Sequence, residues 1–226
     1  MIPQSKGKIY LSDERGYNEM PWFRTYNTFN FGRYFNEHKQ AFGALYVLNE
    51  DVLAGGKGFR MEVETPADII LLPIVGAIAF STEEGHNGLL EAGQVQVLHL
   101  TPGTAFEVRN PYENDLVKFL QLWIKTPDTK SASLTTFDLS HKDQLYTLVN
   151  NDTYTLSIGK FNGRAETTYH LKDRNKGVFV FNIEGAFEVQ YRLLHNGDGL
   201  GLWEVNEVEM EALSNDAILL LLEVAM

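Results

Sequence analysis

The chain has 226 residues, with 19 basic and 30 acidic side chains, a formal net charge of −11 and no cysteine. Without cysteine it forms no disulfide framework and no cysteine-bound metal cluster, so any metal ligand must be His, Asp or Glu, and a reducing cytoplasm is the expected compartment. The acidic balance argues against nucleic acid as a partner, and no apolar stretch approaches the ~20 residues that a membrane-spanning helix needs.

Short apolar or alternating runs, bounded by Gly, Pro, Asn and Asp, predict strands from residue 40 onward. The clearest runs are Leu45–Leu48, Ile69–Ile74, Val95–Leu100, Leu116–Ile124, Thr153–Ile158, Val178–Ile183 and Ala217–Val224. No segment has a sustained helical period, and only Ser140–Val149 is predicted as a short helix or a loop. Regularly spaced short strands predict an all-β sandwich or barrel.

Two segments of the first half recur in the second half. Ile74–Phe80 matches Ile183–Val189 at an offset of 109 residues, and Leu89–Gln94 matches Leu193–Asp198 at an offset of 104. The change of offset is what a shorter hairpin in the second copy would produce. The repeat therefore predicts two tandem β domains, with their boundary in the Pro-, Ser- and Thr-rich segment Thr126–Ser133.

Aromatic and glycine-rich segments stand close together in the first half. They are Arg15-Gly16, Trp22, Thr25–Gly32 with Tyr34, Phe42–Asp51 and Gly55–Phe59. With Gly197–Leu200 and the closing Leu-rich strand, they resemble the pirin family, bicupin proteins that include bacterial quercetin 2,3-dioxygenase-like members. The resemblance covers nearly the whole chain. It implies two tandem cupin barrels, each a jelly-roll-like double-stranded β-helix, over residues 1–126 and 127–226.

The aromatic side chains of the first of these barrels are interpreted as anchors that pack the N-terminal strands onto the barrel, rather than as a surface that stacks on a ligand. They are Phe29, Phe31, Tyr34, Phe35 and Phe42.

The resemblance also implies a metal site, because the N-terminal barrel of the family holds one metal, usually iron, through a His-x-His pair and a His-x-Glu pair. Residues i and i+2 of a strand face the same side, so each pair aims two ligands into the barrel. Alignment on the surrounding glycines places the first pair on Glu62 and Glu64. It places the second pair on Phe106 and Val108, so all four ligand positions have changed.

Several interpretations of the altered site stay open. Two inward-facing carboxylates, Glu62 and Glu64, would make a weak site for Mg²⁺, Mn²⁺ or Ca²⁺, with His99 and Asp68 as the nearest supporting candidates. The same pair would serve as a general acid and base. It would also suit a cationic or polyhydroxylated small molecule in a wet barrel, or it is simply solvated in a vestigial pocket.

We therefore expect a pirin-like bicupin that has lost the metal-dependent dioxygenase activity and serves as a small-molecule-binding or regulatory protein, as a monomer or homodimer without a metal or other cofactor. The alternative is an active oxygenase, or another enzyme, with a rearranged carboxylate-based site. No residue is assigned a catalytic role, because no nucleophile elbow, phosphate loop or dinucleotide fingerprint occurs. In the second barrel, Glu166, Thr168 and His170 alternate on one strand and are interpreted as an exposed face.

Overall fold

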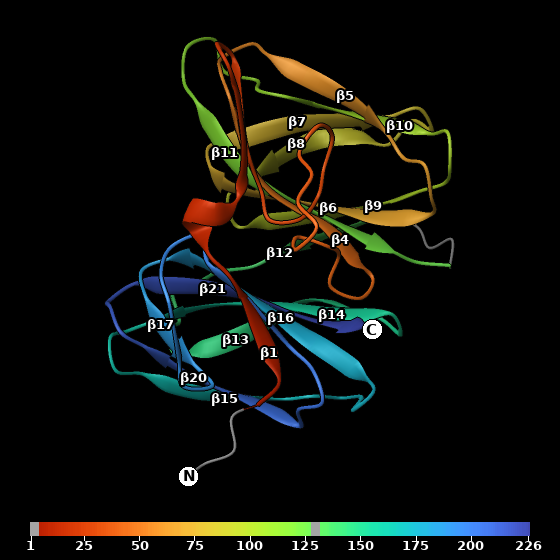
Figure 1. Cartoon of the computed structure of the whole chain (residues 1–226). Helices are drawn as coiled ribbons and strands as arrows, with labels where there is room; N and C mark the ends of the chain where they lie inside the picture. The colour runs from red at the N-terminus through yellow and green to blue at the C-terminus, as the bar shows by residue number, and fades with distance from the viewer. Residues whose placement is uncertain (1–4, 128–131) are drawn as a thin grey trace. The chain divides into compact units, whose positions relative to one another are not determined.

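The structure, a computed structural model, describes residues 5–127 and 132–226. These residues form two compact units, an N-terminal unit from Gly16 to Thr136 and a C-terminal unit that joins Phe137–Met226 to the start of the chain up to Arg15. Each unit consists of two antiparallel sheets (Figure 1). Within the predicted boundary segment, residues 128–131 lie outside the described residues.

The N-terminal unit has a seven-stranded sheet of order β12-β9-β6-β11-β4-β3-β2 and a four-stranded sheet of order β5-β10-β7-β8. Its strands are β2 (Gly16–Met20), β3 (Phe23–Asn27), β4 (Leu45–Leu53), β5 (Gly58–Glu62), β6 (Ala67–Val75), β7 (Ala77–Thr82), β8 (Asn87–Glu91), β9 (Gln94–Leu100), β10 (Ala105–Arg109), β11 (Val117–Lys125) and β12 (Ser133–Thr136).

The C-terminal unit has a six-stranded sheet of order β1-β19-β16-β21-β14-β13 and a four-stranded sheet of order β15-β20-β17-β18. Its strands are β1 (Gly7–Tyr10), β13 (Gln144–Asn150), β14 (Tyr154–Phe161), β15 (Glu166–His170), β16 (Lys176–Glu184), β17 (Phe187–Val189), β18 (Arg192–Leu194), β19 (Gly199–Leu202), β20 (Glu207–Ala212) and β21 (Ala217–Ala225).

The two units repeat one jelly-roll topology. The strand order β9-β6-β11-β4 corresponds to β19-β16-β21-β14, and β5-β10-β7-β8 corresponds to β15-β20-β17-β18. The turns between β6 and β7 and between β16 and β17 even share a backbone angle, because Gly76 and Gly185 both have a φ of 78°. Only glycine adopts that angle without strain. The predicted repeat and the all-β class with two cupin barrels are confirmed.

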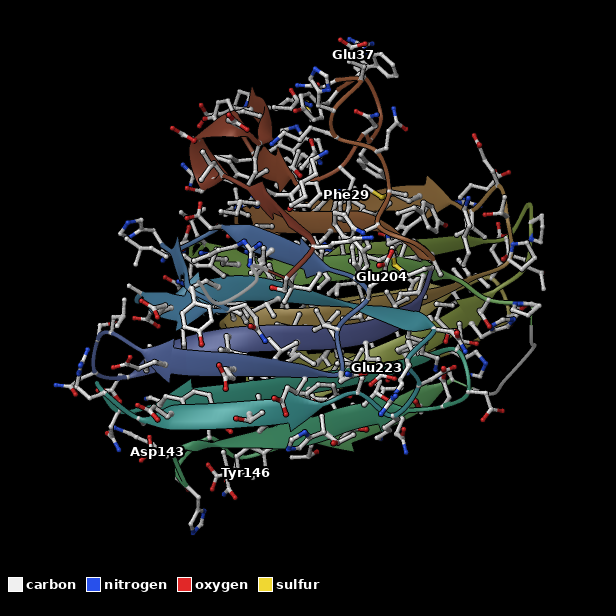
Figure 2. The ribbon with its side chains drawn as sticks, turned by 60° about the horizontal axis from the view of Figure 1, so that its bottom comes forward. Phe29, Glu37, Asp143, Tyr146, Glu204 and Glu223 are labelled. Carbon is white, nitrogen blue, oxygen red and sulfur yellow. The ribbon has the colours of Figure 1, made fainter. Side chains whose placement is uncertain are left out.

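All seven strands predicted above are present, but two other expectations differ from the structure. Ser140–Val149 contains no helix, because residues from Gln144 onward form the edge strand β13, which pairs with β14. Figure 2 shows Asp143 and Tyr146 at the start of this edge. The first strand, β1, pairs with β19 and so belongs to the C-terminal unit, although we expected residues 1–126 to form the first domain.

Each unit buries its own apolar core between its sheets. In the N-terminal unit this core includes Leu53, Phe80 and Phe119, and in the C-terminal unit Phe161 packs edge-on against Phe187 at 5.7 Å. In the described residues, no helix has the length and the apolar character needed to cross a membrane.

Two charged side chains, Asp198 and Glu223, are buried within the described residues of the C-terminal unit, and Glu223 is the more deeply buried. Glu223, which is 0% exposed on β21, accepts hydrogen bonds from the Tyr169 hydroxyl at 2.8 Å and from the backbone N–H groups of Lys172 and Asp173 at 3.0 and 3.1 Å (Figure 2). A buried carboxylate with three donors is stable because its lost hydration is replaced. Glu223 therefore ties the loop after β15 to the main sheet.

Candidate functional site

A pocket of about 520 Å³ lies in the N-terminal unit, between strands β4, β5 and β11 and the segment that joins β3 to β4. Its lining mixes aromatic, apolar and charged side chains. The lining residues are Asn30, Phe31, Gly32, Tyr46, Val47, Met61, Glu62, Glu64, Thr65, Trp123 and Lys125. Figure 2 shows Glu37 at the tip of the joining segment, away from the strands.

Trp123 is the centre of an aromatic group at this pocket. Its indole is surrounded edge-on by Phe31 at 5.6 Å, Phe106 at 5.8 Å and Tyr46 at 6.0 Å between ring centroids. Such tilted pairs are the favoured geometry for aromatic rings. Burial raises the pKa of the Tyr46 hydroxyl above its ordinary value, while a hydrogen bond with Thr65 opposes that shift.

A β-bulge brings Tyr46 into this group. In the pairing of β4 with β11, Trp123 lies opposite Val47, whereas the next residue, Ile124, lies opposite Leu45, so Tyr46 is the extra residue. A bulge turns two successive side chains toward the same side of a sheet. Tyr46 and Val47 therefore both line the pocket.

The indole of Trp123 is held by a chain of buried polar groups. Its Nε1–H donates to the Oε1 atom of Gln121 at 2.9 Å, and the Nε2–H group of Gln121 donates to the carboxylate of Asp51. Gln121 and Asp51 are both 0% exposed. Because the two bonds fix which end of the Gln121 amide points to the indole, the chain Asp51–Gln121–Trp123 sets the ring orientation at the pocket floor.

This polar chain is absent from the candidate residues of the sequence analysis, and so is the neighbouring Asn49, whose side chain is 1% exposed and has no hydrogen-bond partner among the described residues. The sequence of β4 contains a pattern that indicates both the polar chain and Asn49. Asn49 and Asp51 alternate with Val47 and Leu53 in β4, so polar side chains occupy inward positions of a strand whose other inward residues belong to the core.

The carboxylates Glu62 and Glu64 lie at the rim of the pocket, with exposed side chains. The inward positions of this segment belong to Phe59, Met61 and Val63, which pack with the core. The expectation that both glutamates face into the barrel is therefore wrong, because the alternation of the strand turns the apolar residues inward.

The other two positions of the altered metal site are apolar and buried. Phe106 and Val108 are 1% and 0% exposed and belong to the core. In the pairing of β10 with β5, Phe106 lies opposite Met61 and Val108 lies opposite Phe59. The structure thus brings Phe106 to Trp123 and Met61, and not to the glutamates.

His99 and Asp68 form a separate buried pair. They lie opposite each other on β9 and β6, and the Nδ1 atom of His99 is 2.8 Å from the Oδ1 atom of Asp68. Their strand neighbours Ile69 and Leu98 belong to the barrel core, so His99 and Asp68 are on the other face of the sheet. They cannot support a metal in the barrel, and that part of the expectation is wrong.

These residues do not fit the metal centre that the family resemblance implies. Phe106 and Val108 offer no lone pair, and Glu62 and Glu64 are two exposed carboxylates without a third donor. Within residues 5–127 and 132–226, no group of three or more His, Asp or Glu side chains is arranged to hold a metal ion. A tightly held divalent metal needs three or more protein ligands of suitable geometry.

The aromatic anchors divide into two groups. Phe29 and Phe42 are buried, as predicted, with 1% and 4% exposure. Phe31 instead lines the pocket, and Phe35 is 76% exposed, so the anchor interpretation is wrong for Phe35 and incomplete for Phe31. In the C-terminal unit, Glu166, Thr168 and His170 are exposed on β15, as expected.

Comparison with known proteins assigns both halves of the chain. The family model described as Pirin matches residues 10–124, and the model described as the quercetinase C-terminal cupin domain matches residues 139–224. A quercetin 2,3-dioxygenase of Escherichia coli (strain K12) is 23% identical over 224 residues, which covers 94% of this chain and 97% of that protein. A pirin-like protein of Caulobacter vibrioides is 26% identical over 227 residues, with 94% and 97% covered.

Solved structures share the fold. The bacterial pirin YhhW of Escherichia coli in complex with nickel(II) aligns with a TM-score of 0.87 at 20% identity, covering 97% of this chain and 99% of that one. A quercetin 2,3-dioxygenase of Acinetobacter baumannii aligns with a TM-score of 0.74 at 16% identity, covering 98% and 79%. Since the two family models together span nearly all of the sequence, the chain belongs to the pirin family of bicupin proteins.

Proposed function

We propose that this pirin-family protein has lost the metal-dependent dioxygenase activity named for its relatives and works as a small-molecule-binding protein, with its ligand in the pocket beside Trp123. One observation carries the proposal. At the second ligand pair of the family stand Phe106 and Val108, which are buried in the core and supply no lone pair.

The first ligand pair supports the same conclusion. Glu62 and Glu64 are exposed at the rim, and Met61 and Val63 occupy the inward positions that a ligand pair would need. Exposed carboxylates are well hydrated, so two of them bind a divalent ion weakly. The pocket beside them is a cavity with an aromatic floor and a polar rim, which are features of small-molecule binding sites.

The first experiment measures metal content and turnover together. The purified protein is incubated with iron, nickel, copper or manganese, desalted and submitted to elemental analysis, and oxygen consumption is followed with flavonols. We expect no stoichiometric metal and no turnover. A full equivalent of one metal that is lost in Glu62→Ala, or flavonol turnover that depends on Glu62 and Glu64, would establish the alternative, an enzyme with a carboxylate-based site.

A restoration variant supplies the matched control. Replacing four inward-facing residues (Met61→His, Val63→His, Phe106→His and Val108→Glu) places three imidazoles and one carboxylate inside the barrel. We expect this variant to retain a divalent ion under conditions in which the parent protein retains none. If the parent protein retains a stoichiometric divalent ion just as this variant does, the barrel binds metal without these donors and the proposal is wrong.

A further inference from the structure

The charge and the aromatic character of the pocket together identify the class of ligand. We infer that the pocket beside Trp123 binds an organic cation, an ammonium group attached to an apolar or aromatic body. The inference rests on the proposed function, because it requires that this pocket binds a small molecule, and it adds the sign of the ligand's charge.

The rim carries negative charge that the protein does not neutralise. Neither Glu62 nor Glu64 forms an ion pair with any basic side chain of the described residues, whereas Glu83 pairs with Arg60 and Glu50 pairs with Lys118. The only basic side chain in the described pocket lining is Lys125. Two carboxylates against one ammonium group leave the mouth of the pocket net negative, which favours a cation over an anion.

The wall of the pocket also suits a cation. Phe31, Tyr46 and Trp123 present aromatic rings to the cavity, and the face of an aromatic ring attracts a positive charge. One of these rings already contacts an ammonium group, since the Nζ atom of Lys125 lies 5.6 Å from the centroid of the Tyr46 ring. That distance is within the range of a cation–π contact.

Lys125 therefore competes with an ammonium ligand for the ring of Tyr46. Its side chain is exposed and, within the described residues, forms no ion pair, so a free ammonium ligand can take its place over Tyr46. Trp123, in contrast, is fixed by Gln121 and Asp51, and a fixed ring loses little freedom when a ligand binds. The pocket thus has one adjustable charged group and one rigid aromatic floor.

Three ligands of similar size and different charge test the inference by calorimetry at low ionic strength: phenethylammonium, 2-phenylethanol and phenylacetate. We expect the cation to bind tightest and the anion weakest. In the double variant Glu62→Gln/Glu64→Gln, affinity for the cation should fall about fivefold, because exposed charges interact modestly, while affinity for the alcohol should not change. Glu84→Gln, an exposed glutamate outside the pocket, is the control and should behave as the parent protein.

Lys125→Met gives the second, opposite readout. Removing the competing ammonium group should raise affinity for phenethylammonium about two- to threefold and lower affinity for phenylacetate. A shift of the same sign for both ligands would contradict the inference.

The failures of the two proposals are distinguishable. If the alcohol or the anion binds as tightly as the cation, or if none of the three binds while the metal and turnover results stand as expected, the charge assignment is overturned and the loss of dioxygenase activity is untouched. If instead the protein retains a stoichiometric metal or turns over a flavonol, the proposed function itself fails.

Discussion

The two units place different side chains at the same point of one topology. In the N-terminal unit, Trp123 of β11 lies opposite Val47 of β4, and in the C-terminal unit the equivalent pair is Glu223 of β21 opposite Thr155 of β14. Trp123 forms the floor of an open pocket, whereas Glu223 accepts three hydrogen bonds and holds a loop in place. The same position thus lines a pocket in the first unit and anchors a loop in the second.

The residues next to this position also differ between the two units. The N-terminal unit has Gln121 and Asp51 behind its indole, whereas the C-terminal unit has Leu221 and Gly159 at the equivalent places. Every polar group in a buried chain needs a hydrogen-bond partner. Such a chain orients a side chain more sharply than apolar packing does. In this protein, the buried polar chain of Gln121 and Asp51 therefore accompanies the side chain that faces a cavity.

The largest effect is expected from Glu223→Ala. The substitution removes the acceptor of three partly buried donors, the Tyr169 hydroxyl and the backbone N–H groups of Lys172 and Asp173, so we expect the free energy of unfolding of the C-terminal unit to fall by about 3 to 5 kcal/mol. Urea unfolding, followed by the emission of Trp203 with Trp22 and Trp123 replaced by Phe, measures that unit. Glu184→Ala, at an exposed position of β16, is the control, and an equal loss in both variants would contradict a clamp at Glu223.

The second prediction concerns Gln121, whose equivalent in the C-terminal unit is Leu221. Gln121→Leu removes the partner of both the indole N–H and Asp51, and we expect a loss of about 2 kcal/mol in the free energy of unfolding of the N-terminal unit. The emission of Trp123 should shift as its ring loses its fixed orientation. Gln40→Leu, at an exposed glutamine, should change neither quantity. A stable variant with unaltered emission would mean that packing alone positions Trp123.

The third prediction concerns alkaline pH. Burial, followed by the hydrogen bond to Glu223, raises the pKa of the Tyr169 hydroxyl above its ordinary value of about 10. A group whose pKa is higher in the folded state stabilises that state fully below its unfolded pKa, and this contribution is lost as pH rises beyond it. We expect the stability of the C-terminal unit to decline above pH 10, with a shallower decline in Tyr169→Phe. Parallel declines in unfolding titrations would exclude Tyr169 as the cause.

The smallest effect is expected at the pocket rim. Glu62→Gln and Glu64→Gln should change the free energy of unfolding by less than about 0.5 kcal/mol, because both side chains are exposed and form no ion pair within the described residues. Thermal unfolding of the single variants checks this. A large loss would mean that these carboxylates support the fold as Glu223 does, and the contrast between the two units would weaken.

Much of the fold was predictable because its signals are local. Glycine-punctuated apolar runs predict the strands of both main sheets, and the repeated turn at Gly76 and Gly185 predicts the two barrels. The pairing of β1 with β19 has no such signal, since its partners are far apart in the sequence. The strand β13 is misjudged because its mixed sequence has no clear period.

The candidate site was less predictable, for two physical reasons. The alternation of Phe59, Met61 and Val63 with charged residues indicates outward-facing glutamates, and it conflicts with the orientation that the family's ligand pattern implies. The face of His99 cannot be read from hydrophobicity, because nearly every residue of β9 is buried, on both sides of its sheet. The bulge at Tyr46 depends on strand register, which the sequence does not display.

The position of β1 has a consequence for synthesis of the chain. β1 is made before its partner β19, which follows only after the whole N-terminal unit, so Tyr10 pairs with Gly199, a residue 189 positions later in the sequence. Until β19 has been synthesised, β1 has no strand to pair with. Once β19 has formed, its unpaired edge can pair with another molecule until β1 covers it. The pairing of β1 with β19 is therefore a late step of folding, and slowing that step should divert newly made protein into aggregates.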